Sequence, residues 1–204
     1  MPWVVGVSGA SGTPYAKAVL TGLLDAGVPV DVVVSRAARL TILDETGLSF
    51  RDSQWRADLG SWLERDVDAV EHWGPADLAA GPSSGSYPTR GMVVVPASTA
   101  SVAGIALGLS KDLLQRAADV TLKERRPLVV VPRETPYTRS TLQHLLTLHD
   151  AGAVVLPASP GFYAGLSSVQ QLIDFVAAKV LDVLDVKHDL ITRWTGTLGQ
   201  GRQQ

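Results

Sequence analysis

The sequence predicts an α/β fold in which a mostly parallel sheet is covered by helices on both faces. Short apolar, β-branched runs alternate along the chain with longer segments of helical periodicity, without an internal repeat. Hydroxyl, glycine and charged residues collect after these strands, while the segments that precede the strands are plain. Because parallel strands end at one edge of a sheet, this asymmetry indicates an enzyme or ligand-binding domain with one functional rim.

Composition narrows the class of protein. A chain of 204 residues, with 46% hydrophobic and 19% charged residues, is expected to form one globular domain. A net charge of −2 argues against nucleic-acid binding. The chain has no apolar run of membrane-spanning length and no signal-like start, so we expect a cytoplasmic protein without membrane contact. The lack of cysteine and the scattered positions of the four histidines argue against a metal site.

The first strand–helix unit contains a candidate anion-binding loop. Residues 3–7 are a predicted buried strand, and the loop SGASG at 8–12 leads to a helix expected to open at Thr13 and to end at Ala26. A small-residue loop before a helix can cradle a phosphate, because backbone N–H groups and the helix dipole face the same anion. The loop is neither a full G-x-G-x-x-G nor a P-loop with its lysine, so phosphate binding and a plain tight turn both remain open.

The second unit places an acid near a helix end. Residues 28–34 are a predicted buried strand, Ser35 follows it, and residues 36–46 are a predicted helix. Glu45 lies near the C-terminus of that helix, where the dipole disfavours a carboxylate, so it is either a surface residue or a functional acid. The elements expected next are a helix at 51–66, a strand at 67–73, a loop at 81–91, a strand at 92–95, a hydroxyl-rich loop at 96–101 and a helix at 102–109.

The segment from Ser110 to Arg139 holds seven of the eighteen Lys and Arg residues of the chain. Its first part is a predicted helix on which Arg116 and Lys123 are two turns apart and point the same way. A predicted strand at 128–131 then ends in PRETP, at the sheet edge where α/β proteins bind ligands. A solvated charged surface is the simpler interpretation, but the hydroxyl-rich loops at the same edge favour a site for a small anion.

The last third of the chain continues the alternation of helices and strands and ends in a polar tail. The elements expected here are a helix at 139–151, a strand at 153–156, a loop at 157–163, a helix at 167–184 and a polar tail at 187–204. We therefore expect a single domain over residues 1–186, with the tail packing at a subunit interface.

Read together, several of these segments resemble the UbiX-type flavin prenyltransferases. They are GASG at 9–12, Ser35, Glu45, SGS at 84–86, GMVVVPAS at 91–98, LLQRAADVTLKERRPLVVVPRETP at 113–136, PGFY at 160–163 and RW at 193–194. The resemblance spans essentially the whole chain, and the block from Arg116 to Pro136 is its most specific part.

The resemblance implies a flavodoxin-like or Rossmann-like three-layer αβα sandwich that binds FMN non-covalently and needs no metal. The implied reaction transfers a dimethylallyl group from dimethylallyl phosphate, or diphosphate, to reduced FMN. The implied product is prenylated FMN, with a fourth ring bridging N5 and C6, which UbiD-type decarboxylases then use. Members of the family assemble as homododecamers with sites formed between subunits.

Carried over position by position, the resemblance also implies roles for residues of this chain. The residues that match FMN-binding positions are Gly9, Ala10, Ser11, Ser35, Ser98, Ser101 and Arg116. The residues that match ligands of the prenyl phosphate are Lys123, Arg133, Tyr163 and Lys179. The catalytic candidates are Glu45, Glu134 and Lys123, and Trp194 matches a tryptophan of the prenyl pocket. Such cations can stabilise a departing phosphate, and a carboxylate can move the proton lost at C6.

Four positions depart from the pattern of the family. Ala97, Thr99 and Ala100 replace the usual cysteine, methionine and basic residue of one loop, and Lys179 replaces an arginine. Lysine keeps the charge but loses the bidentate fork of arginine, so slower turnover or a changed preference between mono- and diphosphate is expected.

Other functions stay open beside this one. Pro96-Ala97-Ser98 resembles the start of the P-A-S-A-N-T loop of FMN-dependent peptidyl-cysteine decarboxylases, although their catalytic asparagine falls on Ala100. A subunit of a hydroxyarylic acid decarboxylase complex would amount to the same cofactor-supply role. The loop departures are also compatible with a non-catalytic FMN carrier.

Overall fold

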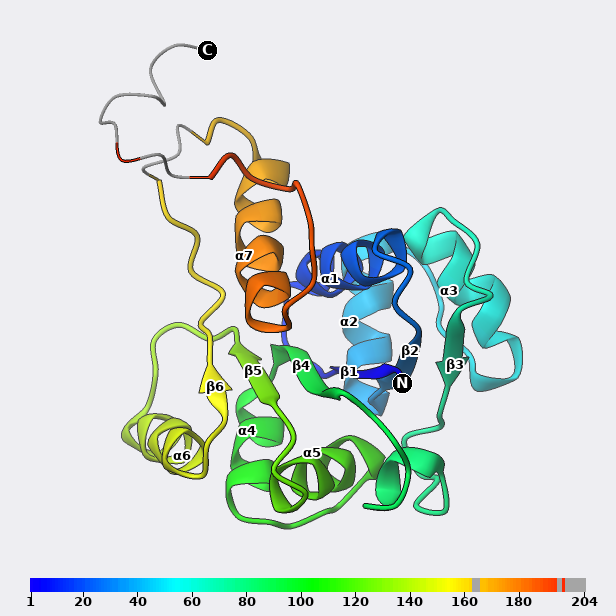
Figure 1. Ribbon diagram of the computed structural model, residues 1–204, viewed down its shortest axis with the longest axis vertical. Coiled ribbons are helices and arrows are strands. Elements are labelled where there is room, and N and C mark those ends of the chain that lie inside the picture. Colours follow the sequence, from blue (N-terminus) through cyan, green and yellow to red (C-terminus); the bar gives the residue numbers. More distant parts are fainter. Residues whose placement is uncertain (163–165, 194–195, 197–204) are drawn as a thin grey trace.

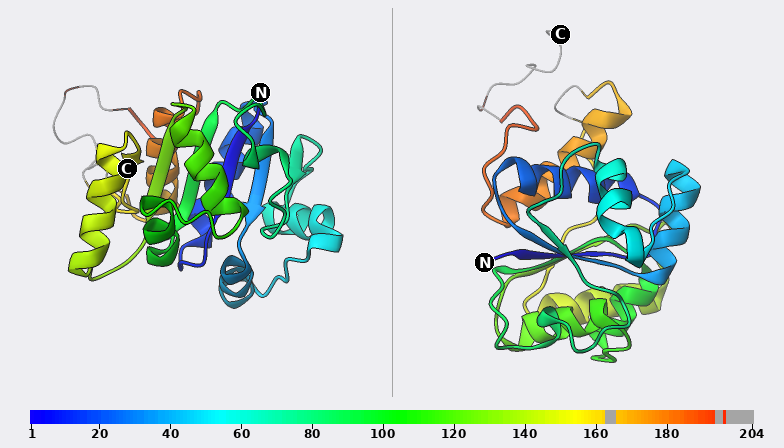
Figure 2. Two further views of the ribbon diagram at one scale, coloured as in Figure 1. Left: turned by 90° about the horizontal axis from the view of Figure 1, so that it is seen from below. Right: turned by 90° about the vertical axis from the view of Figure 1, so that its right-hand side faces the viewer.

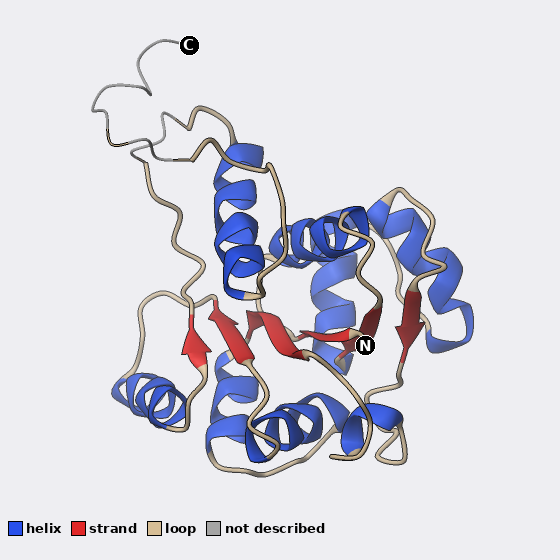
Figure 3. Ribbon diagram, in the orientation of Figure 1, coloured by secondary structure: helices blue, strands red, loops and turns tan. Residues whose placement is uncertain are grey.

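The protein, described here by a computed structural model over residues 1–162, 166–193 and 196, is built on a six-stranded sheet. The strand order is β3-β2-β1-β4-β5-β6, and every neighbouring pair is parallel. Seen along one edge, the sheet lies between two layers of helices (Figure 2), and its strands form the red centre of Figure 3. The predicted three-layer αβα sandwich is confirmed, and the described sheet is entirely parallel.

The elements follow the predicted alternation along the chain (Figure 1). The strands are β1 (Trp3–Val7), β2 (Val30–Val34), β3 (Val70–His72), β4 (Gly91–Ala97), β5 (Leu128–Pro132) and β6 (Val154–Val155). The helices are α1 (Thr13–Asp25), α2 (Arg36–Thr46), α3 (Trp55–Leu63), α4 (Thr99–Ala106), α5 (Leu113–Lys123), α6 (Arg139–Asp150) and α7 (Val169–Val183), with short 3₁₀ turns η1 (Asp52–Gln54) and η2 (Gly81–Ser83). None of the helices in the described ranges is long and apolar enough to cross a bilayer.

Alternating valines divide the interior into two cores. In β1, Val5 and Val7 pack with α1, α2, α3 and α7 on one face, whereas Val4 packs with α4, α5 and α6 on the other. The same division holds for β4 and β5, which is why these strands are continuous apolar runs rather than alternating ones. The order of strands reverses between β1 and β4, so the loops that leave them diverge to opposite faces. Such a switch point leaves a crevice at the carboxyl edge of the sheet.

Several element boundaries differ from those predicted. The cap of α1 is Gly12 in a left-handed conformation (φ 112°), so Thr13 is already the first helical residue. The helix predicted from residue 102 starts at Thr99, because the Ser98 side chain caps it. Strand β2 starts two residues later than predicted, and β3 keeps only three of the seven residues predicted for it. These are changes at element ends, where local sequence signals are weakest.

The first part of the predicted interface tail folds back on its own chain. The carboxylate of Asp182 on α7 accepts a hydrogen bond from Arg193 at 2.8 Å and lies 3.1 Å from Nε2 of His188. Leu190 packs against the core on the same side. Residues 187–193 therefore have an anchor within the chain, and the rest of the tail, apart from residue 196, lies outside the described residues.

Asp31 is a buried carboxyl group in the middle of β2, with 2% of its surface exposed. Burial raises its pKa, and the polar groups of Trp73 and Tyr87 beside it only partly offset that effect. Burial, together with the neighbouring Asp31 carboxylate, raises the pKa of Tyr87 to about 12. The network fastens the loop that contains Tyr87 to the sheet.

We expect Asp31→Asn to stabilise the protein at neutral pH. Because the folded-state pKa of Asp31 is raised above 3.8, its contribution to stability is complete below that value and is lost as pH rises through the folded pKa. The amide carries no charge to bury, so the variant should be more stable by about 1 kcal/mol at pH 7. Urea unfolding across pH 3.5–8 measures this, with exposed Asp150→Asn, remote from Asp31, as the control. A variant equally or less stable than wild type at pH 7 would contradict the expectation.

Candidate functional site

A cleft opens at the carboxyl edge of the sheet, beside the point where the strand order reverses. Its volume is about 460 Å³, which is within the range of small-molecule sites. The loops after β1, β2 and β3 and the starts of α2, α4 and α5 form its walls. The lining residues are Gly9, Ser35, Arg36, Ala37, Pro75, Ala76, Ser98, Ala100, Ser101, Lys111, Asp112 and Gln115. The predicted rim therefore contains a cleft, and Gly9, Ser35, Ser98 and Ser101 line it.

Ser8 joins two loops of this rim. Its side chain is fully buried, and its Oγ donates to the carbonyl of Pro96 at 2.8 Å and accepts from the N–H of Ser98 at 2.7 Å. The Oγ of Ser98 in turn accepts from the N–H of Ser101 at 3.2 Å, at the start of α4. These bonds fix the loops after β1 and β4 relative to each other, so the cleft is preorganised.

The electrostatics of the cleft favour an anion. Helices α2 and α4 both begin at it, and the dipole of each places partial positive charge there. Arg36 and Lys111 line the cleft and add two full charges. The one acidic lining residue is Asp112, whose Oδ1 accepts from the N–H of Gln115 at 2.9 Å and so caps α5. Helix N-termini with nearby cations are a common binding arrangement for phosphate groups.

Arg133 connects the end of β5 to the loop after β1. Its Nε donates to the carbonyl oxygen of Ser11 at 2.7 Å, and its backbone N–H donates to the carbonyl oxygen of Ala97 at 3.3 Å. The structure thus brings Arg133 and Ser11 together at the predicted rim. Glu134 follows on the exposed side and accepts from the N–H of Thr135 at 2.9 Å.

Glu45 occupies the N-terminus of α1. Its Oε1 accepts from the N–H of Gly12 at 2.8 Å, and its Oε2 accepts from the N–H and the hydroxyl of Thr13 at 2.8 and 2.6 Å. The sequence leaves a phosphate open as a ligand for these N–H groups, but they already bind a carboxylate of the same chain. Glu45 is therefore placed at the rim by α2, even though it is 33 residues from Gly12 in the sequence.

The pKa of Glu45 reflects this position. Partial burial raises it, but hydrogen bonds from the side chains of Thr13 and Ser11 and from the backbone of Gly12 and Thr13 outweigh the burial. The pKa of Glu45 is therefore below its ordinary value. The carboxylate is ionised at neutral pH and able to accept a proton.

Arg116 and Lys123 lie away from the cleft. Helix α5 starts at the cleft and ends five residues before β5 begins, so it runs back toward the amino edge of the sheet. The Nε of Arg116 donates to the carbonyl oxygen of Ser83 at 3.1 Å, and Lys123 forms an ion pair with Glu124 in the last turn. Arg116 therefore does not line the cleft although Gln115 beside it does, and α5 carries Lys123 away from the rim where Arg133 lies.

Of the remaining predicted residues, Lys179 is described by the structure and does not line the cleft of its own chain. Lys179 lies on α7, with its Nζ 3.6 Å from the carboxylate of Asp182. Tyr163 and Trp194, predicted for the phosphate site and the prenyl pocket, lie outside the described residues. Within the described ranges, no cluster of three His, Asp or Glu residues is placed to hold a metal ion.

Sequence reasoning missed several residues that the structure places at the rim. Arg36 and Lys111 line the cleft, and Gln115 closes one wall. Arg36 directly follows the predicted cap Ser35, so a cation at a helix N-terminus was available as a signal. No sequence pattern indicates that Thr13 binds Glu45, because this contact depends on how α2 packs beside the start of α1.

Comparison with known proteins gives a consistent result. A family model described as Flavoprotein matches residues 1–181. The chain is 66% identical to the flavin prenyltransferase UbiX of Streptomyces coelicolor, over 99% of both chains. It is also similar to the crystal structure of AnUbiX (PadA1) in complex with FMN and dimethylallyl pyrophosphate, with a TM-score of 0.85, 38% identity and coverage of 96% and 98%. The dodecameric FMN-dependent UbiX-like decarboxylase of Escherichia coli O157:H7 gives the same TM-score and identity over 96% of this chain and 100% of that one.

Proposed function

Because this chain belongs to the flavoprotein family of UbiX flavin prenyltransferases, we propose that it transfers a dimethylallyl group from dimethylallyl phosphate or diphosphate to reduced FMN. The protein is a flavin prenyltransferase and FMN is its cofactor. The observation that carries the finer proposal is the loop at residues 8–12: Gly9 lines the cleft, Ser11 binds Arg133, and Gly12 binds the ionised Glu45.

The residues of the cleft fit FMN. A phosphate group is matched by the N-termini of α2 and α4 with Arg36, and the hydroxyls of Ser35, Ser98 and Ser101 lie on the same wall. The loop of Gly9, Ala10 and Ser11 would hold the flavin beside Arg133. When bound and reduced, FMN supplies the nucleophilic ring atoms that receive the prenyl group.

The chain's own side chains supply the rest of the chemistry. Arg133 would bind the phosphate of the donor and stabilise the charge that grows on it as the C–O bond breaks. Glu45, with Glu134 as the second acid, would accept and return a proton at a carboxylate oxygen. Ser8 and the caps of α2 and α4 keep these groups in one orientation.

The prenyl-phosphate site is proposed to combine residues of more than one subunit. Arg116, Lys123 and Lys179 are cations that one chain holds away from its own cleft. In a closed homo-oligomer, such as the dodecamer seen for the related Escherichia coli protein, each chain can present them to a neighbour. A UbiD-type decarboxylase would then receive the prenylated FMN.

The direct test is binding followed by product formation. Titration of the apo-protein should show FMN bound with a micromolar or lower Kd, with FAD bound at least about tenfold more weakly. Incubation with reduced FMN and each donor should yield a flavin heavier by one prenyl group. A chain that binds FMN but forms no such product with either donor would favour the non-catalytic FMN carrier. Release of CO₂ from a peptidyl-cysteine substrate would favour the decarboxylase.

A further inference from the structure

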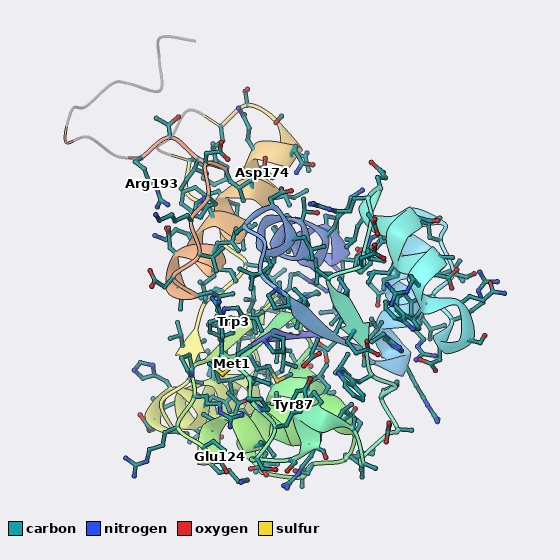
Figure 4. All side chains as sticks on the ribbon, turned by 45° about the vertical axis from the view of Figure 1, so that its right-hand side comes forward. Met1, Trp3, Tyr87, Glu124, Asp174 and Arg193 are labelled. Carbon is teal, nitrogen blue, oxygen red and sulfur yellow. The ribbon has the colours of Figure 1, made fainter. Side chains whose placement is uncertain are left out.

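A turn at residues 84–86 packs directly on the last turn of α5. A Cβ atom placed on Gly85 would lie 2.1 Å from Oε1 of Glu124 and 2.7 Å from Nζ of Lys123. A Cβ atom there would push both side-chain ends away, so their present approach depends on the bare Cα of glycine. In Figure 4 the side chains of Tyr87 and Glu124 lie around the green helices α4 and α5, on the face of the sheet opposite α1 and α7.

Arg126, which lies between the end of α5 and the start of β5, holds this turn in place. Its Nη2 donates to the carbonyl oxygen of Gly85 at 2.7 Å. Its Nη1 donates to the carbonyl oxygen of Tyr87 at 2.9 Å and to the hydroxyl of Thr89 at 3.1 Å. The planar guanidinium thus binds three acceptors on one short segment, which a lysine could not reproduce. Since the ring of Tyr87 also packs edge-on against Trp73, with centroids 6.3 Å apart, the segment is fixed at both its guanidinium contact and its aromatic ring.

The ammonium group of Lys123 lies between the turn at Gly85 and the carboxylate of Glu124. Its ammonium group is paired with the carboxylate of Glu124, and the pair holds the pKa of Glu124 below its ordinary value. About half of the Lys123 side chain (47%) is exposed, so the ammonium remains accessible to a ligand. The turn at Gly85 closes the other side and limits where the ammonium can lie.

We propose that Gly85 and Arg126 are positioning residues for Lys123: Arg126 fixes the turn, and Gly85 lets the ammonium of Lys123 lie against it at the place where the prenyl phosphate binds. This inference rests on the proposed function, in which Lys123 is a ligand of that phosphate. Neither Gly85 nor Arg126 touches the reacting atoms.

The two residues differ in how a substitution acts on the fold. The atoms that a Cβ at Gly85 would meet are the ends of two flexible side chains, so Gly85→Ala displaces Lys123 and Glu124 rather than the backbone. Its effect on stability is therefore small. Arg126→Gln removes three hydrogen bonds and releases the turn, so it lowers stability as well as moving the turn.

The experiment measures donor KM, kcat, FMN Kd and Tm for the full-length variants. Gly85→Ala should raise the donor KM about tenfold with Tm and FMN Kd unchanged, because ground-state binding of the donor is lost. Arg126→Gln should raise the KM at least as much, and Arg126→Lys should recover part of the loss. Gly74→Ala, at a glycine with open space around it, and Arg125→Gln, an exposed arginine next to Arg126, are the matched controls and should behave as wild type.

Lys123→Ala distinguishes the phosphate-binding role of Lys123 from the positioning role of Gly85 and Arg126. If Lys123→Ala raises the KM while Gly85→Ala does not, the positioning role is wrong and the proposed function stands. If Lys123→Ala leaves the KM unchanged, Lys123 is not a phosphate ligand, and both its proposed role and the positioning role fail, whereas product formation tests the proposed function separately. In the double variant, Gly85→Ala should add nothing to Lys123→Ala, because Gly85 acts only through Lys123. Additive effects on KM, or a fall in Tm for Gly85→Ala that tracks the loss of activity, would also overturn the inference.

Discussion

Glu45→Gln is expected to lower prenyl transfer by a factor of about 10²–10⁴, the usual contribution of a positioned acid or base. The substitution keeps the size of the side chain and removes its ability to take up or release a proton. It also presents an amide NH₂ to groups that donate hydrogen bonds to Glu45, which are the N–H of Gly12 and the N–H and hydroxyl of Thr13. Single-turnover formation of prenylated flavin, followed by absorbance and mass, measures the loss.

The matched control for this variant is Asp44→Asn, which removes the same charge from the exposed neighbouring residue. It should keep wild-type activity and FMN affinity. Because the pKa of Glu45 is lowered in the folded state, its capping contribution is complete above pH 4.5 and is lost as pH falls through the folded-state pKa. The stability difference between wild type and Glu45→Gln, about 1 kcal/mol at pH 7, should therefore shrink in acid. Equal turnover by Glu45→Gln would move the proton-transfer role to Glu134.

The fold was accessible from the sequence because its signals are local. Continuous valine runs such as Val32 to Val34 identify strands buried on both faces, and residues 36–46 were bounded correctly because Ser35 and Gly47 are a typical cap and stop. The rim was also predictable, since the hydroxyls of Ser35 and Ser98 follow strands directly and parallel strands share one carboxyl edge.

What the sequence could not supply is the contact between distant segments. The bond from Thr13 to Glu45 spans 32 residues, and the bond from Arg133 to Ser11 spans 122, so neither leaves a periodic or spaced signal. For the cations of α5, in contrast, the sequence gives a clear local signal but not their place in the fold. Arg116 and Lys123 share a helix face as expected, but helical spacing says nothing about which edge of the sheet that face approaches.

The direction of α5, from the carboxyl edge of the sheet toward the amino edge, determines which cations can share a phosphate. Helix α5 is 11 residues long, or about 16 Å at 1.5 Å per residue. Lys123 ends it near the amino edge, whereas Arg133 follows β5 at the carboxyl edge. Two cations at opposite edges of one sheet cannot bind the same phosphate. If both are ligands of one prenyl phosphate, as proposed, they belong to different subunits.

Lys123→Ala and Arg133→Ala are therefore expected to complement each other. Each variant alone should lose activity by a factor of about 10² or more, because one charge on the departing phosphate is lost. In a mixed assembly some sites combine the intact Arg133 of one chain with the intact Lys123 of another. Random mixing of equal amounts gives about one quarter of the sites both cations, so about one quarter of wild-type activity should return. Co-expression with two different tags and purification through both ensures that only mixed assemblies are assayed. As a control, assemblies in which one chain in four is wild type and the rest are either single variant should show the same one quarter of wild-type activity. A doubly tagged assembly that contains both variants and stays as inactive as its parents would show that Lys123 and Arg133 serve separate sites.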